Sequence, residues 1–289
     1  MTRRGRRWVV RGVGAVAAIT VLSAGALLVF NSTAWPQRSP ADFSRQFDAA
    51  FVRATAWMVE HPEPNNSALL HMVADMAQMS GDARLRSISD RFLNDTVIDP
   101  LSLWRRLVDP NWPTVQAVLR PTLDTYQEYQ RWILYGAAPD YVQLTADERA
   151  NMFSPDKFWW GKRTHQLFAL VFYRAQKPET VGLGALIDTL AVGIAREQPW
   201  DVRMTDLYIQ RAAFLLAAGR PDLVERRWVE RILDNQQPDG GWCESWHGLG
   251  PGAFAFTLAT PRSTSHPSVQ AAWVLYMLKY RYPDWFTRR

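Results

Sequence analysis

The feature that most constrains how this chain folds is a turn motif that follows a helical segment. The motif reads Gln-Gln-Pro-Asp-Gly-Gly-Trp, covers residues 236–242 and comes directly after an amphipathic segment at 222–235. Pro238 cannot continue a helix, and the Asp-Gly-Gly behind it tolerates a tight turn with positive φ. Trp242 brings a large apolar surface that a folded chain has to bury. The motif therefore predicts the end of a helix and then a turn anchored by a buried tryptophan.

Helical periodicity runs through nearly the whole chain after residue 39. Phe43, Phe47 and Phe51 recur every four residues, and Ser39-Pro40 before them suits a helix start. The alternation of apolar and polar residues that is typical of strands is absent from the sequence. The other segments with helical periodicity are 67–79, 83–94, 100–108, 114–136, 164–176, 180–196, 204–218, 222–235 and 267–281. The sequence therefore predicts an all-α fold.

In the second half of the chain, the pattern of apolar and charged residues predicts helices that alternate between two layers. Segments 164–176 and 204–218 are apolar on most faces, as helices surrounded by neighbours are. Segment 222–235 carries many charged residues, and we expect an outer helix there with one wet face. Inner and outer helices in alternation predict a solenoid or an α/α toroid, a barrel of helical hairpins that can be incomplete.

The amino terminus has the pattern of a membrane anchor. Residues 1–11 carry five arginines and no acidic residue, and the 19 residues from 12 to 30 are apolar apart from Thr20 and Ser23. About 20 apolar residues span a bilayer core, and arginines on one side predict a cytoplasmic amino terminus. We therefore expect a single-pass signal anchor in the cell membrane. A signal peptide cleaved near residues 32–34 is the alternative.

The predicted membrane anchor divides the chain into four parts and accounts for its net charge. The predicted parts are a cytoplasmic basic tail at 1–11, a transmembrane anchor at 12–30, a linker at 31–39 and an extracytoplasmic helical domain at 40–289. The net charge of +5 equals the five arginines of the tail, so the rest of the chain is balanced. The charge therefore favours a membrane and gives no reason to expect nucleic acid as a partner. The single cysteine, Cys243, excludes a disulfide within the chain.

The turn motif lies between two segments that carry a family resemblance. The segments read Val-Glu-Arg-Ile-Leu at 229–233 and His-Pro-Ser-Val-Gln-Ala-Ala-Trp-Val-Leu at 266–275. Together with the motif they resemble the α/α-toroid family of terpene (squalene) cyclases and protein prenyltransferase β subunits. The resemblance implies that the turn ties an outer helix to the next inner helix. It implies a glutamine bonded to helix ends, with the tryptophan beside it.

The chemistry of these families does not follow from the resemblance. Class II cyclases protonate their substrate with an Asp-x-Asp-Asp motif, and this chain has no such tetrad. Prenyltransferases hold zinc with an Asp-x-Cys pair and a distant histidine, whereas three residues separate Asp239 from Cys243 here. Three substrate classes are therefore compatible with the sequence: small molecules, lipids and saccharides.

Three residues that suit proton transfer stand at or beside the starts of apolar segments. They are His165, Asp206 and His266. If their helices are inner and parallel, the three side chains meet at one mouth of the toroid, where helix amino termini also favour anions. We therefore predict His165, Asp206 and His266 as catalytic residues, with His165 and Asp206 as a metal-free acid–base pair.

A zinc site is the alternative. Cys243, His247 and His266 are competent ligands, and a catalytic zinc needs three protein ligands and an open position. Cys243-x-x-x-His247 alone is a weak zinc motif, because zinc motifs commonly show a second pair. The same residue types also serve as helix caps and as hydrogen-bonding groups in loops, without any chemistry.

The sequence is compatible with two functions from different classes. The first is a cyclase-like or prenyltransferase-like enzyme, anchored in the membrane and acting at the cell envelope. The second is a toroid without catalysis that serves as a binding or scaffolding module of an envelope complex. Residues 158–160 with Trp242 and Trp246 are aromatic candidates to line a pocket for an isoprenoid or a sugar. The glycine-rich segment 247–265 has the length of a functional lid.

Overall fold

The computed structural model is helical throughout the parts of the chain that it describes. These are residues 3–30, 37–63, 65–95, 102–113, 120–155, 162–201, 206–243 and 262–287. Within them the β-structure is one isolated bridge between Trp242 and Thr264, which confirms the all-α prediction.

Thirteen α-helices and five segments of 3₁₀- or π-helix are described. The α-helices are α1 (Arg3–Phe30), α2 (Pro40–Glu60), α3 (Ser67–Ser80), α4 (Ala83–Asn94), α5 (Arg105–Val108), α6 (Arg120–Leu123), α7 (Glu128–Ala137), α8 (Ala146–Met152), α9 (Lys162–Gln176), α10 (Leu183–Glu197), α11 (Asp206–Ala217), α12 (Arg226–Asp234) and α13 (Ser265–Tyr276). The 3₁₀-helices are η1 (Ser102–Trp104), η2 (Gln198–Trp200), η3 (Pro221–Leu223) and η5 (Pro283–Thr287), and η4 (Met277–Arg281) is a π-helix.

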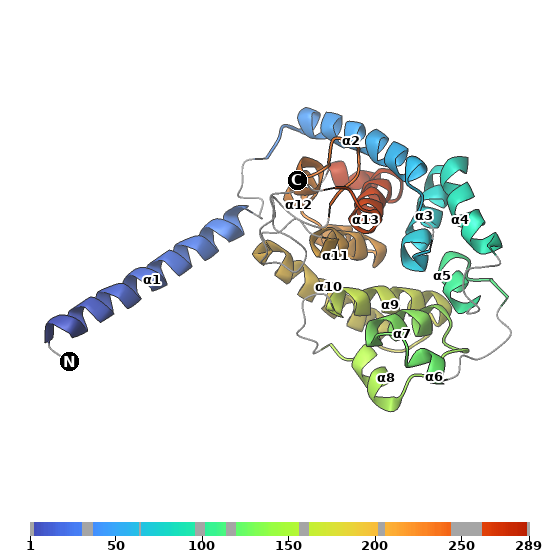
Figure 1. Ribbon diagram of the computed structural model, residues 1–289, viewed down its shortest axis with the longest axis horizontal. Helices are drawn as coiled ribbons and strands as arrows, with labels where there is room; N and C mark the ends of the chain where they lie inside the picture. The colour runs from blue at the N-terminus through green and yellow to red at the C-terminus, as the bar shows by residue number, and fades with distance from the viewer. Residues whose placement is uncertain are drawn as a thin grey trace.

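Six of the helices contact one another in a closed cycle, here termed the helix ring (Figure 1). Following the contacts, α3 meets α13, α13 meets α11, α11 meets α9, α9 meets α7, α7 meets α5, and α5 returns to α3. The helices between them in the chain pack against ring members: α4 on α3, α10 on α9 and α11, and α12 on α11. Because α2 contacts both α12 and α13, the beginning of the helical body lies against its end.

The turn at 236–242 joins three helices through hydrogen bonds. The Gln236 amide nitrogen donates to the carbonyl oxygen of Ala50 in α2 at 2.9 Å and to that of Gly240 at 2.9 Å. The indole N–H of Trp242 donates to the carbonyl of Ile232 near the end of α12 at 2.8 Å. Its backbone N–H donates to the Ser268 hydroxyl in α13 at 2.7 Å. Trp242 is 1% exposed, so the predicted buried anchor is confirmed.

The prediction that segment 222–235 has one solvent-exposed, charged face is wrong for the middle of α12. The charged side chains of Arg227, Glu230 and Arg231 are buried there. Glu230 lies 3.3 Å from Arg226 and 3.8 Å from Arg227, and the Arg231 guanidinium stacks over a buried tyrosine ring and donates to a backbone carbonyl. Ion pairs and stacking allow these charges to be buried.

α1 covers the segment where the sequence predicts the membrane anchor, and it projects from the helical body (Figure 1). Among the residues that the structure describes, no helix has both the length and the apolar character needed to cross a membrane. The predicted transmembrane helix at 12–30 therefore gains no support from the structure.

Candidate functional site

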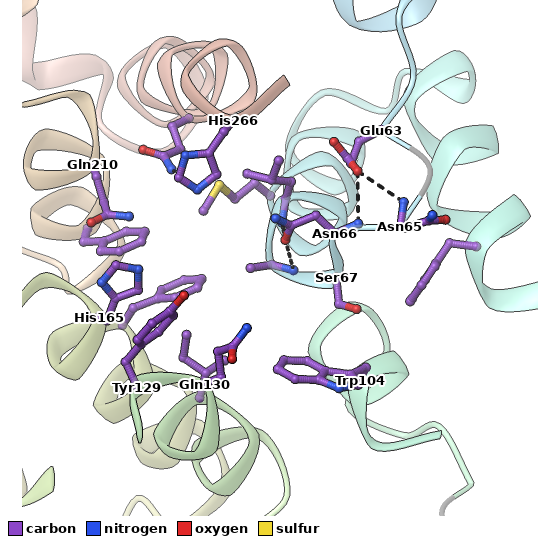
Figure 2. A pocket seen from close by; sticks show the side chains of 18 of the residues that line it. Glu63, Asn65, Asn66, Ser67, Trp104, Tyr129, Gln130, His165, Gln210 and His266 are labelled. Atoms are coloured by element: carbon purple, nitrogen blue, oxygen red, sulfur yellow. Dashed lines mark hydrogen bonds between the residues drawn. The ribbon is translucent and has the colours of Figure 1, made fainter. Parts of the chain in front are cut away.

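A cavity of about 510 Å³ lies where the amino-terminal ends of the ring helices meet, and it is here termed the central cavity. Each helix of the ring contributes to its lining a residue from its first five positions (Figure 2). In chain order these residues are Ser67, Arg105, Tyr129, His165, Gln210 and His266. Six helix starts thus converge on one space, and two of the three residues that the sequence predicts at such a mouth, His165 and His266, line it.

Aromatic side chains close the inner end of the central cavity. The rings of Phe168 and Phe214 are stacked, with centroids 4.3 Å apart and an angle of 4° between their planes. Trp273 lies edge-on to both, at 6.2 Å from Phe168 and 6.5 Å from Phe214. Beyond this aromatic floor, a second cavity of about 370 Å³ is lined by residues nearer the carboxyl-terminal ends of the same helices, among them Phe172. The floor therefore separates two cavities along the axis of the helix ring.

His266 and Asp206 form a direct contact at the central cavity. Nδ1 of His266 lies 3.1 Å from Oδ2 of Asp206, and both side chains are half-buried. The other carboxylate oxygen of Asp206 accepts the backbone N–H of Leu207 at 2.8 Å, because Asp206 is the first residue of α11. A carboxylate at Nδ1 holds the proton on that nitrogen and leaves Nε2 as the basic atom of the neutral ring.

The surroundings of Asp206 keep it ionised. Burial works to raise the pKa of Asp206, but the hydrogen bond and the charge of His266 oppose it. The Leu207 N–H and the charge of His165 act in the same direction as His266, so the pKa of Asp206 lies below its usual 3.8. At neutral pH Asp206 is therefore a carboxylate that can stabilise a protonated imidazole.

Gln270 lies one helical turn after His266 and contacts its other nitrogen. Its amide nitrogen is 3.2 Å from Nε2 of His266, and the side chain is 1% exposed. With the Nδ1 proton directed at Asp206, Nε2 of His266 accepts this amide N–H. The amide oxygen of Gln270 is buried without a hydrogen-bond partner in the described part of the chain.

His165 lies on the same cavity as His266. Its ring packs against Tyr129 of α7, with ring centroids 4.4 Å apart, and both line the central cavity. The neighbouring Thr164 donates its hydroxyl proton to the Gln210 amide oxygen at 2.6 Å, which joins the starts of α9 and α11. The structure thus brings His165, Asp206 and His266 together, but it pairs Asp206 with His266, whereas the sequence predicts a pair with His165.

The predicted zinc ligands do not form a site among the described residues. Cys243 is buried near Gln237, whose amide nitrogen lies 3.9 Å from Sγ, and His266 contacts Asp206 instead. His247 lies outside the described residues. Over the ranges given above, no three His, Cys, Asp or Glu side chains gather in a way that could hold a metal ion.

The predicted aromatic lining differs from the observed one. Residues 158–160, Trp246 and nearly all of the segment 247–265 lie outside the described residues, and Trp242 is buried within its turn. The aromatic residues of the observed lining include Trp104, Tyr126 and Tyr129, which the sequence did not single out. Trp104 and Tyr129 lie in η1 and α7, within segments where the sequence predicts helices, and Tyr126 lies in the turn before α7. Periodicity predicts the helices but does not tell which aromatic rings reach a cavity.

Several amides of the central cavity were also missed. Asn66, Gln130 and Gln270 line it together with Gln210. Gln270 could have been found, because it is four residues after His266 and side chains at that spacing meet on a helix. Asn66 and Gln130 carry no such signal, since they read as ordinary cap residues.

Comparison with protein-family models, with curated proteins and with solved structures found no match for this chain. Its function is therefore argued from the geometry of the central cavity.

Proposed function

We propose that this protein is an α/α-toroid enzyme that holds a small organic substrate in the central cavity and acts on it by metal-free acid–base catalysis. The observation that carries the proposal is the 3.1 Å contact between His266 and Asp206 at the wall of that cavity. A cavity lined by two histidines, one of which pairs with a carboxylate whose pKa is lowered, has the features of an active site.

The toroid part of the proposal is supported by the closed cycle of contacts and by the turn at 236–242. The turn ties α12 to α13 through Trp242 and reaches α2 through Gln236, as the resemblance to the cyclase and prenyltransferase family implies. We extend the resemblance to the fold only. Amide and imidazole groups line the central cavity beside apolar side chains such as Leu69, Met72 and Ile133, and a hydrocarbon substrate offers these polar groups no hydrogen bonds.

In the proposed mechanism His266 moves the proton. Asp206 orients the imidazole through Nδ1 and stabilises the positive charge that forms when Nε2 accepts a proton from the substrate or from water. Gln270 donates to Nε2 in the resting state and yields this position to the substrate. His165 lies on the same cavity and serves as the second proton-transfer group. Asp206 and His266 are half-buried, which strengthens their interaction relative to that of a fully exposed pair.

Substitution of the paired residues tests the proposal. The purified protein is screened for turnover of pooled esters, amides, glycosides and uronic-acid glycans. We expect His266→Gln and Asp206→Asn to lower kcat/KM of the substrate found by about 100-fold or more, as the loss of an acid–base group does. His61→Gln is the matched control, because His61 lies on the surface near the end of α2, stacked on Trp57. Equal turnover by His266→Gln and the wild type would sink the acid–base role.

A further inference from the structure

Two buried amides on the central cavity each have one polar atom without a partner. Gln210 is 3% exposed and Gln270 is 1% exposed. The Gln210 oxygen accepts the Thr164 hydroxyl, and its amide nitrogen makes no hydrogen bond within the described residues. In Gln270 the arrangement is reversed. Its amide nitrogen bonds to His266, and its amide oxygen has no hydrogen-bond partner in the part of the chain that the structure describes. The wall of the cavity therefore offers one spare donor and one spare acceptor.

A hydroxyl group satisfies both kinds of spare atom. It donates one proton and accepts through its lone pairs, whereas a carboxylate or phosphate only accepts and an ammonium group only donates. The Gln270 oxygen is buried without a partner among the described residues, which is costly, so a ligand that supplies this hydrogen bond is favoured over one that does not. The spare atoms of Gln210 and Gln270 thus point to a ligand whose groups both donate and accept, as hydroxyls do.

The outer part of the cavity adds aromatic side chains. Trp104, Tyr126 and Tyr129 line it and are half-buried. Trp104 donates its indole N–H to the Tyr126 hydroxyl at 3.2 Å, and the two rings meet edge to face with centroids 5.4 Å apart. This bond holds the indole in place, and Figure 2 shows Trp104 beside the cavity. Fixed aromatic rings offer a surface for the C–H faces of a sugar ring.

The charged residues of the rim are already engaged by the protein. The Glu63 carboxylate accepts the backbone N–H groups of Asn65 and Asn66 at 3.2 and 3.0 Å. Arg105 donates to the backbone carbonyl of Asp95. Asn65 and Asn66 also line the cavity, and Figure 2 shows both beside Glu63. This lining suits a polar ligand whose recognition does not depend on a full charge.

We propose that the substrate of the central cavity is a saccharide, with sugar hydroxyls bound by Gln210 and Gln270 and a ring face packed on Trp104 or Tyr129. The inference rests on the proposed function for its site and names the substrate class. The volume of about 510 Å³ lies within the range of small-ligand pockets, roughly 300–1,000 Å³. An isoprenoid of similar size supplies no hydrogen bond to the Gln210 nitrogen or to the Gln270 oxygen.

Binding is measured on the full chain, with a glycan array of neutral, amino and uronic-acid oligosaccharides and then titration calorimetry of each hit. We expect at least one glycan to bind, and we expect Gln210→Ala and Trp104→Ala each to weaken it about tenfold or more. Trp104→Phe keeps most of the affinity, because it keeps an aromatic face. Gln78→Ala is the control, since Gln78 lines the second cavity. Gln130→Ala replaces Gln210→Ala if the latter does not fold.

Two outcomes overturn the saccharide inference. In one, no glycan binds while farnesol or a peptide from a parallel screen does. In the other, glycan affinity is the same in the wild type, Trp104→Ala and Gln130→Ala. His266→Gln separates this inference from the proposed function. Glycan binding without any His266-dependent turnover contradicts the enzyme alone, whereas His266-dependent turnover of another substrate contradicts the saccharide alone.

Discussion

At the scale of single residues, Asp206 illustrates how neighbours set an acid's strength. Burial by itself disfavours the carboxylate, yet His266, the Leu207 N–H and the charge of His165 together hold its pKa below 3.8. A folded-state pKa below the unfolded one means that ionised Asp206 stabilises the fold above pH 3.8. That contribution disappears as the pH falls through the lowered pKa.

Removal of His266 should reverse this shift. In His266→Ala the effect of burial is opposed by fewer groups, so we expect the pKa of Asp206 to rise. The acid-induced loss of stability tied to Asp206 then begins at a higher pH than in the wild type. Carboxyl ¹³C NMR of Asp206 and urea unfolding between about pH 3 and pH 7 measure both effects. An unchanged Asp206 pKa in His266→Ala would mean that the contact does not form in solution.

At the scale of elements, the turn at 236–242 can be predicted from the sequence because the residues that specify it are neighbours in the chain. Proline, glycine and tryptophan act through their own backbone and size, and the structure uses each of them. The periodicity over 114–136 predicts a single helical segment, but the described part contains α6 and α7 with a turn between them. Gln127 caps the start of α7 through a reciprocal bond with Gln130, a role that apolar periodicity does not reveal.

Gly240 gives the sharpest test of the turn. Its φ is 97°, and a Cβ there would lie 2.5 Å from the carbonyl oxygen of Arg53 in α2. Gly219 has a similar φ of 87° with nothing within 4 Å of a Cβ, so it is a matched control. We expect Gly219→Ala to lower the free energy of unfolding by about 1 kcal/mol through backbone strain, and Gly240→Ala by about 3 kcal/mol through strain and the clash. Equal midpoints in urea would contradict the close approach of α2.

At the scale of the whole molecule, closure of the helix ring depends on contacts between distant parts of the chain. Asp75 of α3 accepts the indole N–H of Trp273 in α13 at 2.7 Å and pairs with Arg281 of η4 at 2.6 Å. Asp75 is therefore a link that joins the third helix of the chain to the last α-helix. Nothing in the sequence around either residue indicates this pairing.

Substitutions of Asp75 separate its two interactions. Asp75→Asn keeps an acceptor for Trp273 and loses the ion pair, so we expect a loss of less than about 1 kcal/mol in the free energy of unfolding. Asp75→Ala leaves the indole N–H without its partner, and we expect a loss of about 2 kcal/mol. Asp188→Ala is the control, because its pair with Arg220 is on the surface. If Asp75→Ala costs no more than Asp188→Ala in urea unfolding, the link does not hold the ring closed.

The periodicity of the sequence is enough to predict the all-α class. The chemistry of neighbouring residues predicts the buried tryptophan of the turn and places His165, Asp206 and His266 at or beside helix starts, and all of these are local properties. The pairing of Asp206 with His266, the burial of Arg227, Glu230 and Arg231 in α12 and the amides that line the central cavity follow from the tertiary structure alone. Each of these depends on which residues, far apart in the chain, are brought within a few ångströms, and no single segment of sequence specifies that.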